Sequence, residues 1–532
     1  MMNLNLSLLP RSFQGSSTTA HDYNTWKVIL SKMSGPARKS IFIGTFIFCR
    51  DLNTLERLKD TAVCVNDQGV IIAMERNFNQ EAQFTQILLA RLGWIDSKVV
   101  VYRSKEGQFF FPGFIGSFTP DFDMRILRSN EADPVDTHIH APQFSNSGIF
   151  GKTTLLDWLD TYTFPTEGSM EDLSKASQVY TRCIQRTLSH GTTTAVYFAT
   201  RHVNASNLLA DICLAKGQRA FIGRCCMDSE LNPVYYRDLS PEACINDTRA
   251  SIEHIAAIDP QNKLITPIIT PRFALSCTSH AMHALGLLQK ETGLPVQTHI
   301  SETKSEVNLV RELFPQCTSY ADVYDQHGLL GEKTILAHAV HLTEEESNLI
   351  KLRRSKISHC PISNSALASG QARIRWLLEK GIDVGLGSDV SGGYSTSILE
   401  TARHALLVSR HVATHDNDEA KLSVEEVLYL ATRGGAKLVG MEKKIGAFEV
   451  GMIWDAQLIG LSMCRDETSP TEDDGLVDIF SWEEEENQIN KWLFNGDDRN
   501  SLAVWVQGNL VHQRRNFQGT LLSTVSKLPV DM

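Results

Sequence analysis

The chain has 532 residues, 42% of them hydrophobic and 21% charged, so it can bury a large core as one big domain with an appendage or as two to three smaller domains. The net charge of -11 and the lack of a Lys/Arg-rich block argue against a nucleic acid as the main partner and favour a small-molecule substrate. The longest apolar runs, such as residues 41–49, have only the length of a strand, which argues against a membrane-spanning helix.

The cysteines and the N-terminal residues bear on the compartment and the start of the chain. The eleven cysteines are odd in number and form no CxxC pair, which is not typical of a disulfide framework and favours a reducing compartment, the cytosol. Residues 1–38 show little periodicity and several Ser and Thr. We expect a disordered or non-homologous extension there rather than a transit peptide, and Met33 is an alternative start.

The segments at the two ends of the chain predict a separate sheet. Between residues 39 and 112, short β-branched and aromatic runs are separated by turn residues. Similar runs return in residues 445–532, whereas the acidic stretch 482–488 is typical of a solvated helix face. We therefore expect the two segments to build one small β-sandwich beside the central domain.

Residues 113–444 alternate between apolar strands and helical patterns. One such helix is predicted over 169–191, with Ser169 and Asp172 as its N-terminal cap and Gly191 as its stop. Eight strands that alternate with helices predict a closed (β/α)8 barrel rather than an open sheet. The predicted strands are 135–140, 191–199, 219–227, 264–270, 295–300, 334–340, 356–360 and 383–389.

Groups suited to metal chemistry follow several of these strands. His138 and His140 are two positions apart, so their side chains share one face of the strand. His299, His338 and Asp389 end other strands, and the ends of barrel strands meet at one mouth. Three of these four imidazoles together with the carboxylate are suited to zinc or iron(II) with a position left for water, whose pKa such a metal lowers to about 7. Taken singly, each histidine could instead be a buried residue bonded to a carbonyl, and Asp389 could cap a helix.

Several motifs carry a resemblance to a known family. In order they are DTHIHAPQ (136–143), WLDTYTFPTE (158–167), TPRFALSC (270–277), QTHISETKSEV (297–307), LAHAV (336–340), SHCPISNSALASG (358–370), DVGLGSDVSGGYS (383–395) and GDDRN (496–500). The metal motifs resemble the amidohydrolase superfamily, and the TYTFPTE and TPRF segments resemble its guanine deaminase branch. The likeness covers residues 39–511. It implies hydrolytic deamination of guanine to xanthine and ammonia in purine catabolism.

The resemblance implies a role for each matching residue. His138, His140, His299 and Asp389 would bind one Zn2+, with Fe2+ as the alternative. His338 would lie beside the attacking hydroxide. Gln143, Arg272, Phe273 and Glu302 would hold the purine, and His338 and Asp389 would also contact it.

The implied mechanism is acid–base catalysis at a hydrolytic centre. Asp389 would accept the proton of the attacking water, and Glu302 would protonate ring N3 and then help to deliver a proton to the leaving ammonia. The resemblance also implies a homodimer. Two alternatives stay open: a related amidohydrolase that acts on another purine, a pyrimidine or a triazine ring, and a catalytically impaired scaffold of the same fold. The H-x-E pattern of the other zinc deaminase architecture does not occur in this sequence.

Residues 116–135 interrupt the expected first strand of the barrel. The family pattern runs directly from PGFI into DTHIH, whereas here twenty residues containing Pro120 and Pro134 intervene. Three explanations are open: a loop extruded at the N-terminal face, a strand that begins only at Val135, or a translated fragment that splicing normally removes. The last is favoured, because the segment has no motif and its flanks rejoin cleanly. If translated, the segment is expected to orient His138 and His140 less firmly.

Overall fold

The computed structural model of the chain describes residues 38–78, 82–95, 98–113, 136–464, 477–514 and 520–522. The predicted extension before residue 38, with its alternative start at Met33, and the atypical segment 116–135 lie outside these ranges. Within them, no helix is both long enough and apolar enough to cross a membrane.

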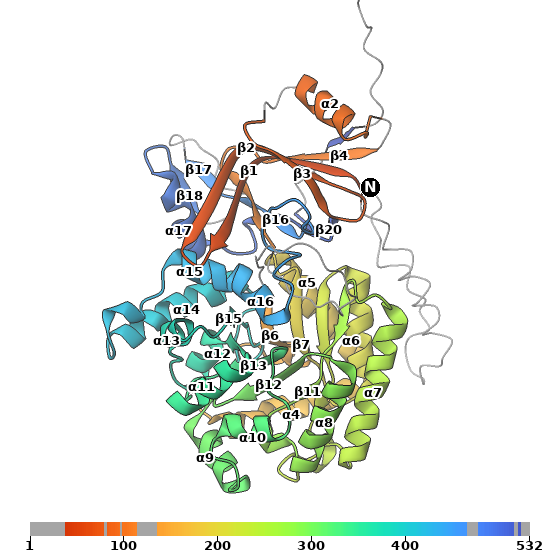
Figure 1. Cartoon of the computed structure of the whole chain (residues 1–532), viewed down its shortest axis with the longest axis vertical. Coiled ribbons are helices and arrows are strands. Elements are labelled where there is room, and N and C mark those ends of the chain that lie inside the picture. Colours follow the sequence, from red (N-terminus) through yellow and green to blue (C-terminus); the bar gives the residue numbers. More distant parts are fainter. Residues whose placement is uncertain are drawn as a thin grey trace, which may run out of the picture. The chain divides into compact units, whose positions relative to one another are not determined.

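Eight parallel strands form the central sheet (Figure 1). Each lies within one of the eight predicted ranges, so this part of the prediction is confirmed. Ile269 joins the two outer strands, since its amide donates to the Pro295 carbonyl (2.9 Å) and its carbonyl accepts from the Gln297 amide (2.9 Å). The strands therefore close into the expected barrel. In spatial order they are β10 (Ile265–Pro267), β8 (Arg219–Gly223), β7 (Thr194–Phe198), β6 (Asp136–His140), β15 (Val384–Leu386), β14 (Lys356–His359), β13 (Thr334–His338) and β12 (Val296–Ile300).

Two predicted strands are interrupted rather than continuous. Range 219–227 contains β8 and then β9 (Cys225–Cys226), and range 264–270 contains β10 and the first residue of β11 (Thr270–Pro271). Strands β9 and β11 pair with each other in a separate small ladder. Pro267 has no amide hydrogen to donate, which suits the break after β10. The second ladder extends the rim of the barrel and ends directly before Arg272.

Helices follow the strands, and most of them lie around the outside of the barrel (Figure 1). The helix predicted over 169–191 is α5 (Leu173–Ser189), which begins later than expected. Its N-cap is Asp172, which accepts from the Ser174 amide (2.9 Å), whereas Ser169 belongs to a preceding 3-10 turn. The others are α3 (Leu155–Trp158), α4 (Phe164–Gly168), α6 (Val203–Lys216), α7 (Pro241–Ile258), α8 (Ser279–Thr292), α9 (Lys304–Leu313), α10 (Tyr320–Gln326), α11 (Glu344–Arg353), α12 (Pro361–Ala366), α13 (Ile374–Glu379), α14 (Ile398–Ala413), α15 (Val424–Tyr429) and α16 (Gly435–Val439).

A second, nine-stranded sheet combines the N- and C-terminal segments, as expected. Strand β5 pairs antiparallel with β16, so a segment before the barrel is bonded to one after it. On one edge, strand β1 pairs with β4 through its first residues and with β5 at Phe46. On its other edge it pairs with β2, and the register of that pairing shifts between Gly44 and Phe46. The strands are β1 (Ser40–Asp51), β2 (Thr54–Val65), β3 (Ile71–Glu75), β4 (Val99–Arg103), β5 (Gln108–Pro112), β16 (Ala456–Gly460), β19 (Ser501–Val506), β20 (Asn509–Gln513) and β21 (Thr520–Leu522). Helices α2 (Ala82–Arg91) and α17 (Glu485–Asn495) and the short pair β17 (Ser462–Cys464) and β18 (Asp478–Phe480) accompany this sheet.

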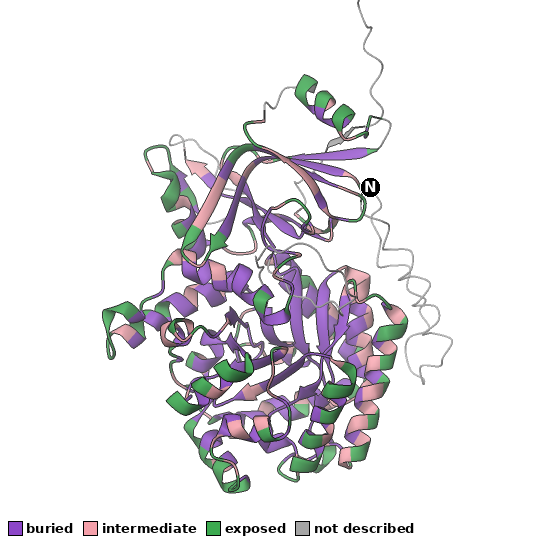
Figure 2. Ribbon diagram, viewed as in Figure 1, coloured by how far each residue is buried: buried purple, intermediate pink, exposed green. Residues whose placement is uncertain are grey.

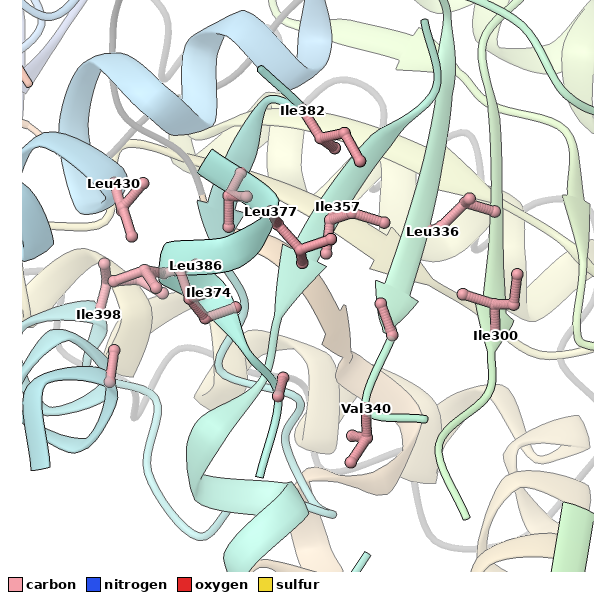
Figure 3. Close-up of a cluster of buried hydrophobic side chains, with 14 of the residues drawn as sticks. Ile300, Leu336, Val340, Ile357, Ile374, Leu377, Ile382, Leu386, Ile398 and Leu430 are labelled. Carbon is pink, nitrogen blue, oxygen red and sulfur yellow. The ribbon is translucent and has the colours of Figure 1, made fainter. Parts of the chain in front are cut away.

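Apolar burial holds both sheets together. Figure 2 shows barrel strands that are buried and surrounding helices whose outer faces are exposed. In one part of the barrel core, aliphatic side chains of β12, β13 and β14 pack with those of the following helices (Figure 3). The nine-stranded sheet has an aromatic core instead, in which the Trp454 ring stacks on Phe42 with centroids 3.9 Å apart. Side chains of this size contribute several kcal/mol each when buried.

Polar contacts join the barrel to the nine-stranded sheet. Arg219, at the start of β8, forms a fully buried ion pair with Asp455. The Gly113 amide donates to the Asp455 carbonyl (3.1 Å), and a Cβ at Gly113 would lie 2.2 Å from the Thr193 side chain. Asp136 pairs with Ala195 in the next strand. The two residues that flank segment 114–135 therefore both lie beside the beginning of β7.

Candidate active site

Strand β6 presents two histidines to the mouth of the barrel and is held firmly from Asp136 onward. The buried Asp136 carboxylate accepts from the Ser388 amide (3.0 Å) and hydroxyl (2.7 Å). Farther along, the Asp389 amide donates to the His138 carbonyl (2.8 Å), and the His140 amide donates to the Val390 carbonyl (3.0 Å). The bonds that orient both imidazoles thus lie within β6 and the loop after β15.

The four predicted metal ligands converge on one point. His140 Nε2 lies 3.2 Å from both His138 Nε2 and His299 Nε2. Asp389 Oδ1 lies 3.2 Å from His138 Nε2 and 3.5 Å from His140 Nε2. Nitrogen atoms that face one another at this distance cannot all donate, so their lone pairs suit a shared cation. The donor set of three imidazoles and one carboxylate is typical of a catalytic divalent metal.

The charge states of these groups match that arrangement. Burial lowers the pKa of His138, and burial together with neighbouring imidazoles lowers the pKa values of His140 and His299 much further. Burial alone would raise the pKa of Asp389, but the charge and hydrogen bond of His138, with smaller effects of other histidines, lower it to about 2. The site therefore offers neutral imidazoles and an ionised carboxylate, the forms that bind metals.

A backbone contact fixes one ligand tautomer. His299 Nδ1 donates to the Arg272 carbonyl (2.5 Å), which leaves its Nε2 lone pair directed at the other ligands. His138, His338 and Cys360 form another group with ligand atoms within 4.8 Å of one another. Burial raises the pKa of the Cys360 thiol well above its usual value. That group accordingly offers a protonated thiol, whereas the group of four predicted ligands offers neutral imidazoles and an ionised carboxylate.

Two proton-carrying groups lie beside the ligands. Glu302 Oε2 is 3.6 Å from His338 Nε2, and Asp389 Oδ2 is 3.8 Å from the same nitrogen. Burial raises the pKa of Glu302 to about 7, so this carboxyl changes protonation near neutrality. Burial lowers the pKa of His338, but the Glu302 and Asp389 charges outweigh burial and raise it overall.

Hydrogen bonds from one segment orient these two groups. His338 Nδ1 lies 2.9 Å from Asn364 Oδ1, and because that oxygen only accepts, the proton of His338 Nδ1 points toward it. The Ser369 hydroxyl donates to Glu302 Oε1 (2.9 Å). Both contacts come from the segment 358–370. The motif SHCPISNSALASG in the sequence indicates no such role for Asn364 or Ser369.

The predicted purine contacts line the same cavity. Gln143, Arg272 and Phe273 are all buried, and the Phe273 ring meets the His299 ring edge-to-face with centroids 6.1 Å apart. Every predicted site residue except His138 lines this cavity, with apolar walls from α3 and its surroundings, among them Trp158. His138 lies just behind the cavity surface with 1% of its area exposed.

One central residue was missed. Glu167, at 0% exposure, accepts from Gln143 Nε2 (2.7 Å), Arg272 Nη1 (2.5 Å) and the Tyr236 hydroxyl (2.8 Å). Burial lowers the pKa of Arg272, but the Glu167 carboxylate and other partners more than offset this, so the pKa lies above its usual value. The available signal was the motif WLDTYTFPTE, whose last residue is Glu167.

The barrel and its convergent donor set define a metal-dependent hydrolase. The model of the Amidohydrolase family matches residues 134–511, and the chain belongs to this family. Among its relatives, a probable guanine deaminase of Schizosaccharomyces pombe is 45% identical over 88% of this chain and 83% of its own. The guanine deaminase of Homo sapiens is 37% identical over 90% of this chain and 97% of its own. The crystal structure of guanine deaminase from C. acetobutylicum with bound guanine has a TM-score of 0.74 and 31% identity, and covers 89% of this chain and 100% of its own.

Proposed function

We propose that the chain is a zinc-dependent guanine deaminase, which hydrolyses guanine to xanthine and ammonia. The observation that carries the proposal is the convergence of His138, His140, His299 and Asp389 beside the Glu302–His338 pair in one cavity. The similarity to guanine deaminases over most of the chain supports guanine as the substrate.

The four ligands fit a single divalent metal ion. Their imidazoles are neutral, their donor atoms are mutually close, and the His299 tautomer is fixed. Nitrogen and oxygen donors of this number favour zinc, with iron(II) as the alternative. When bound, such a metal lowers the pKa of water to about 7 and so supplies a nucleophile at neutral pH.

The protein's own groups then move the protons. Asp389, ionised at neutral pH, accepts a proton of the attacking water as the oxygen adds to C2 of guanine. Glu302, whose pKa of about 7 keeps it partly protonated, donates to N3. The Asp389 proton then passes, with the help of Glu302, to the amino nitrogen, so that the C2–N bond breaks and ammonia leaves. The C2 hydroxyl gives its remaining proton to Glu302 and becomes the carbonyl of xanthine, which restores both carboxyl groups. The pKa of His338 is raised, so its protonated form stabilises negative charge that develops beside Glu302 and Asp389.

The remaining predicted residues would hold the ring. Gln143 and Arg272 supply polar contacts to its edge, and Phe273 offers an apolar face. These assignments rest on their position in the cavity and on the resemblance of the surrounding motifs. The homodimer and the cytosolic location stay predictions, which sedimentation of the purified protein and cell fractionation would test.

An absorbance assay with metal analysis tests the proposal. Conversion of guanine to xanthine is followed in the ultraviolet, with zinc and iron quantified in the same preparation. We expect turnover of guanine and close to one zinc per chain. Turnover of another purine, a pyrimidine or a triazine, with guanine inert, would support the first alternative. A folded protein without metal or turnover would support the scaffold alternative, which the complete set of ligands argues against.

A further inference from the structure

The buried carboxylate of Glu167 lies behind the wall of the active-site cavity. It comes from α4 and bonds two wall residues from different parts of the barrel, Gln143 after β6 and Arg272 after β11. We propose that Glu167 determines specificity for a 6-oxopurine by fixing which atoms Gln143 and Arg272 present to the ring. This inference rests on the proposed function and goes beyond it, because it identifies the group that selects the substrate edge.

The orientation of the Gln143 amide follows from its partner. An ionised carboxylate can only accept, so the 2.7 Å contact with Glu167 Oε1 must be made by the Gln143 NH2 group. The amide oxygen therefore points away from Glu167. Its contacts with Ser391 are long, 3.4 Å to the amide and 3.5 Å to the hydroxyl. The oxygen is thus available to accept a hydrogen bond from a ligand.

Arg272 is fixed by the other oxygen of the same carboxylate. Its Nη1 donates to Glu167 Oε2 at 2.5 Å, and its guanidinium lies over the Phe164 ring at 5.1 Å. A guanidinium carries five N–H donors and no acceptor, so the face left toward the cavity can bind only acceptor atoms. Without Glu167, a buried guanidinium would lose the charge that compensates it.

The two wall residues together present one acceptor and a set of donors. The 6-oxo edge of guanine has the complementary pattern, because N1 carries a hydrogen and O6 is an acceptor. A 6-amino ring has the reverse pattern, an acceptor at N1 and donors at the exocyclic amine. Such a ring would place donor against donor and acceptor against acceptor, and sites with this kind of mismatch reject ligands strongly.

Glu167 is a positioning residue that acts through Gln143 and Arg272. A competing role, in which it acts on the metal site through His140, can be distinguished by experiment. Its Oε1 lies 4.0 Å from His140 Nδ1, too far for a hydrogen bond. If that contact governed its effect, a substitution would change the metal content. If Glu167 acts on Gln143 and Arg272, the metal content stays and the selectivity changes.

The test compares two substrates that react at the same carbon. Guanine and 2,6-diaminopurine both carry the 2-amino group, and only the substituent at C6 and the proton at N1 differ. We measure kcat and KM for both, with metal content, on the purified wild-type protein, Glu167→Gln and Glu167→Asp. For Glu167→Gln we expect the ratio of kcat/KM for guanine over 2,6-diaminopurine to fall at least tenfold, mainly through a higher KM for guanine. Glu167→Asp keeps the charge and should retain part of the ratio.

Glu426→Gln is the matched control. Glu426 is also a buried glutamate paired with an arginine, Arg375 (2.7 Å), but it caps α15 and does not line the cavity. Its substitution should lower the thermal midpoint and leave the substrate ratio unchanged. The inference would be overturned if the substrate ratio of Glu167→Gln is unchanged, or if it changes only together with a loss of metal. In either case, wild-type turnover of guanine would leave the proposed function intact. A wild-type protein that does not deaminate guanine would overturn both.

Discussion

Substitution of Glu302 by glutamine should remove proton transfer and leave the site otherwise intact. Glutamine has the same shape, and its amide oxygen can still accept the Ser369 hydroxyl bond of 2.9 Å. The contact of Glu302 Oε2 with His338 Nε2 is 3.6 Å, so no short hydrogen bond is lost there. A positioned acid–base group contributes about 10²- to 10⁴-fold to the rate. We therefore expect kcat to fall by that factor, equivalent to about 3–5 kcal/mol in the activation free energy.

The assay follows guanine absorbance together with metal content. Glu302 is not one of the four proposed metal ligands, so the variant should retain its full metal content. It should also bind guanine with a similar KM. Ser369→Ala is the comparison variant, because it removes only the orienting hydroxyl and should cost about tenfold in kcat. A Glu302→Gln protein that keeps its metal and works within tenfold of the wild-type rate would refute the assignment of Glu302 to proton transfer.

Three further predictions concern metal, pH and stability. His299→Ala should lower the metal content and abolish turnover, and a variant that keeps its full metal content would contradict the ligand assignment. Chelation of the metal from the wild-type protein should lower the thermal midpoint. In the metal-free protein the pKa of Glu302 is raised from 4.5 to about 7, so the folded state holds this proton more tightly than the unfolded chain. The resulting stability is present below about pH 4.5 and is lost by about pH 7, a change of about 3 kcal/mol. Urea unfolding across this range should show a steeper decline for the wild-type protein than for Glu302→Gln, and equal declines would disprove the coupling. Asp455→Asn should lower the free energy of unfolding by about 3–5 kcal/mol, because it leaves the buried Arg219 charge without its partner; thermal or urea denaturation measures this, and a loss below about 1 kcal/mol would contradict it.

The convergence of the four predicted metal ligands could be foreseen because each belongs to a local pattern. His138 and His140 follow the two-residue period of a strand, and Asp389 follows an apolar run at its end. In a closed barrel, strand ends that are distant in the sequence meet at one mouth. The fold class and the proximity of these side chains therefore follow from periodicity and topology together.

Contacts that depend on tertiary packing could not be predicted in the same way. Glu167 lies in a short helix, and its partners Gln143 and Arg272 are 24 and 105 positions away. The motif WLDTYTFPTE marks its position, but nothing in the motif shows that its carboxylate is buried between these two partners rather than solvated. The interruptions after β8 and β10 and the exact start of α5 likewise depend on local hydrogen bonding that apolar periodicity does not record.

The pairing of β5 with β16 has a consequence for the order of folding. The two strands contact each other across 345 positions, for example where Gln457 donates to the Pro112 carbonyl. At a synthesis rate of about 5–20 residues per second, the partner of β5 leaves the ribosome roughly 17–70 s after β5 itself. During that interval β5 has an unpaired edge that can associate with other chains. The nascent protein can therefore complete the nine-stranded sheet only after its C-terminal strands have been synthesised, so the early strands wait for partners that the whole barrel sequence separates from them.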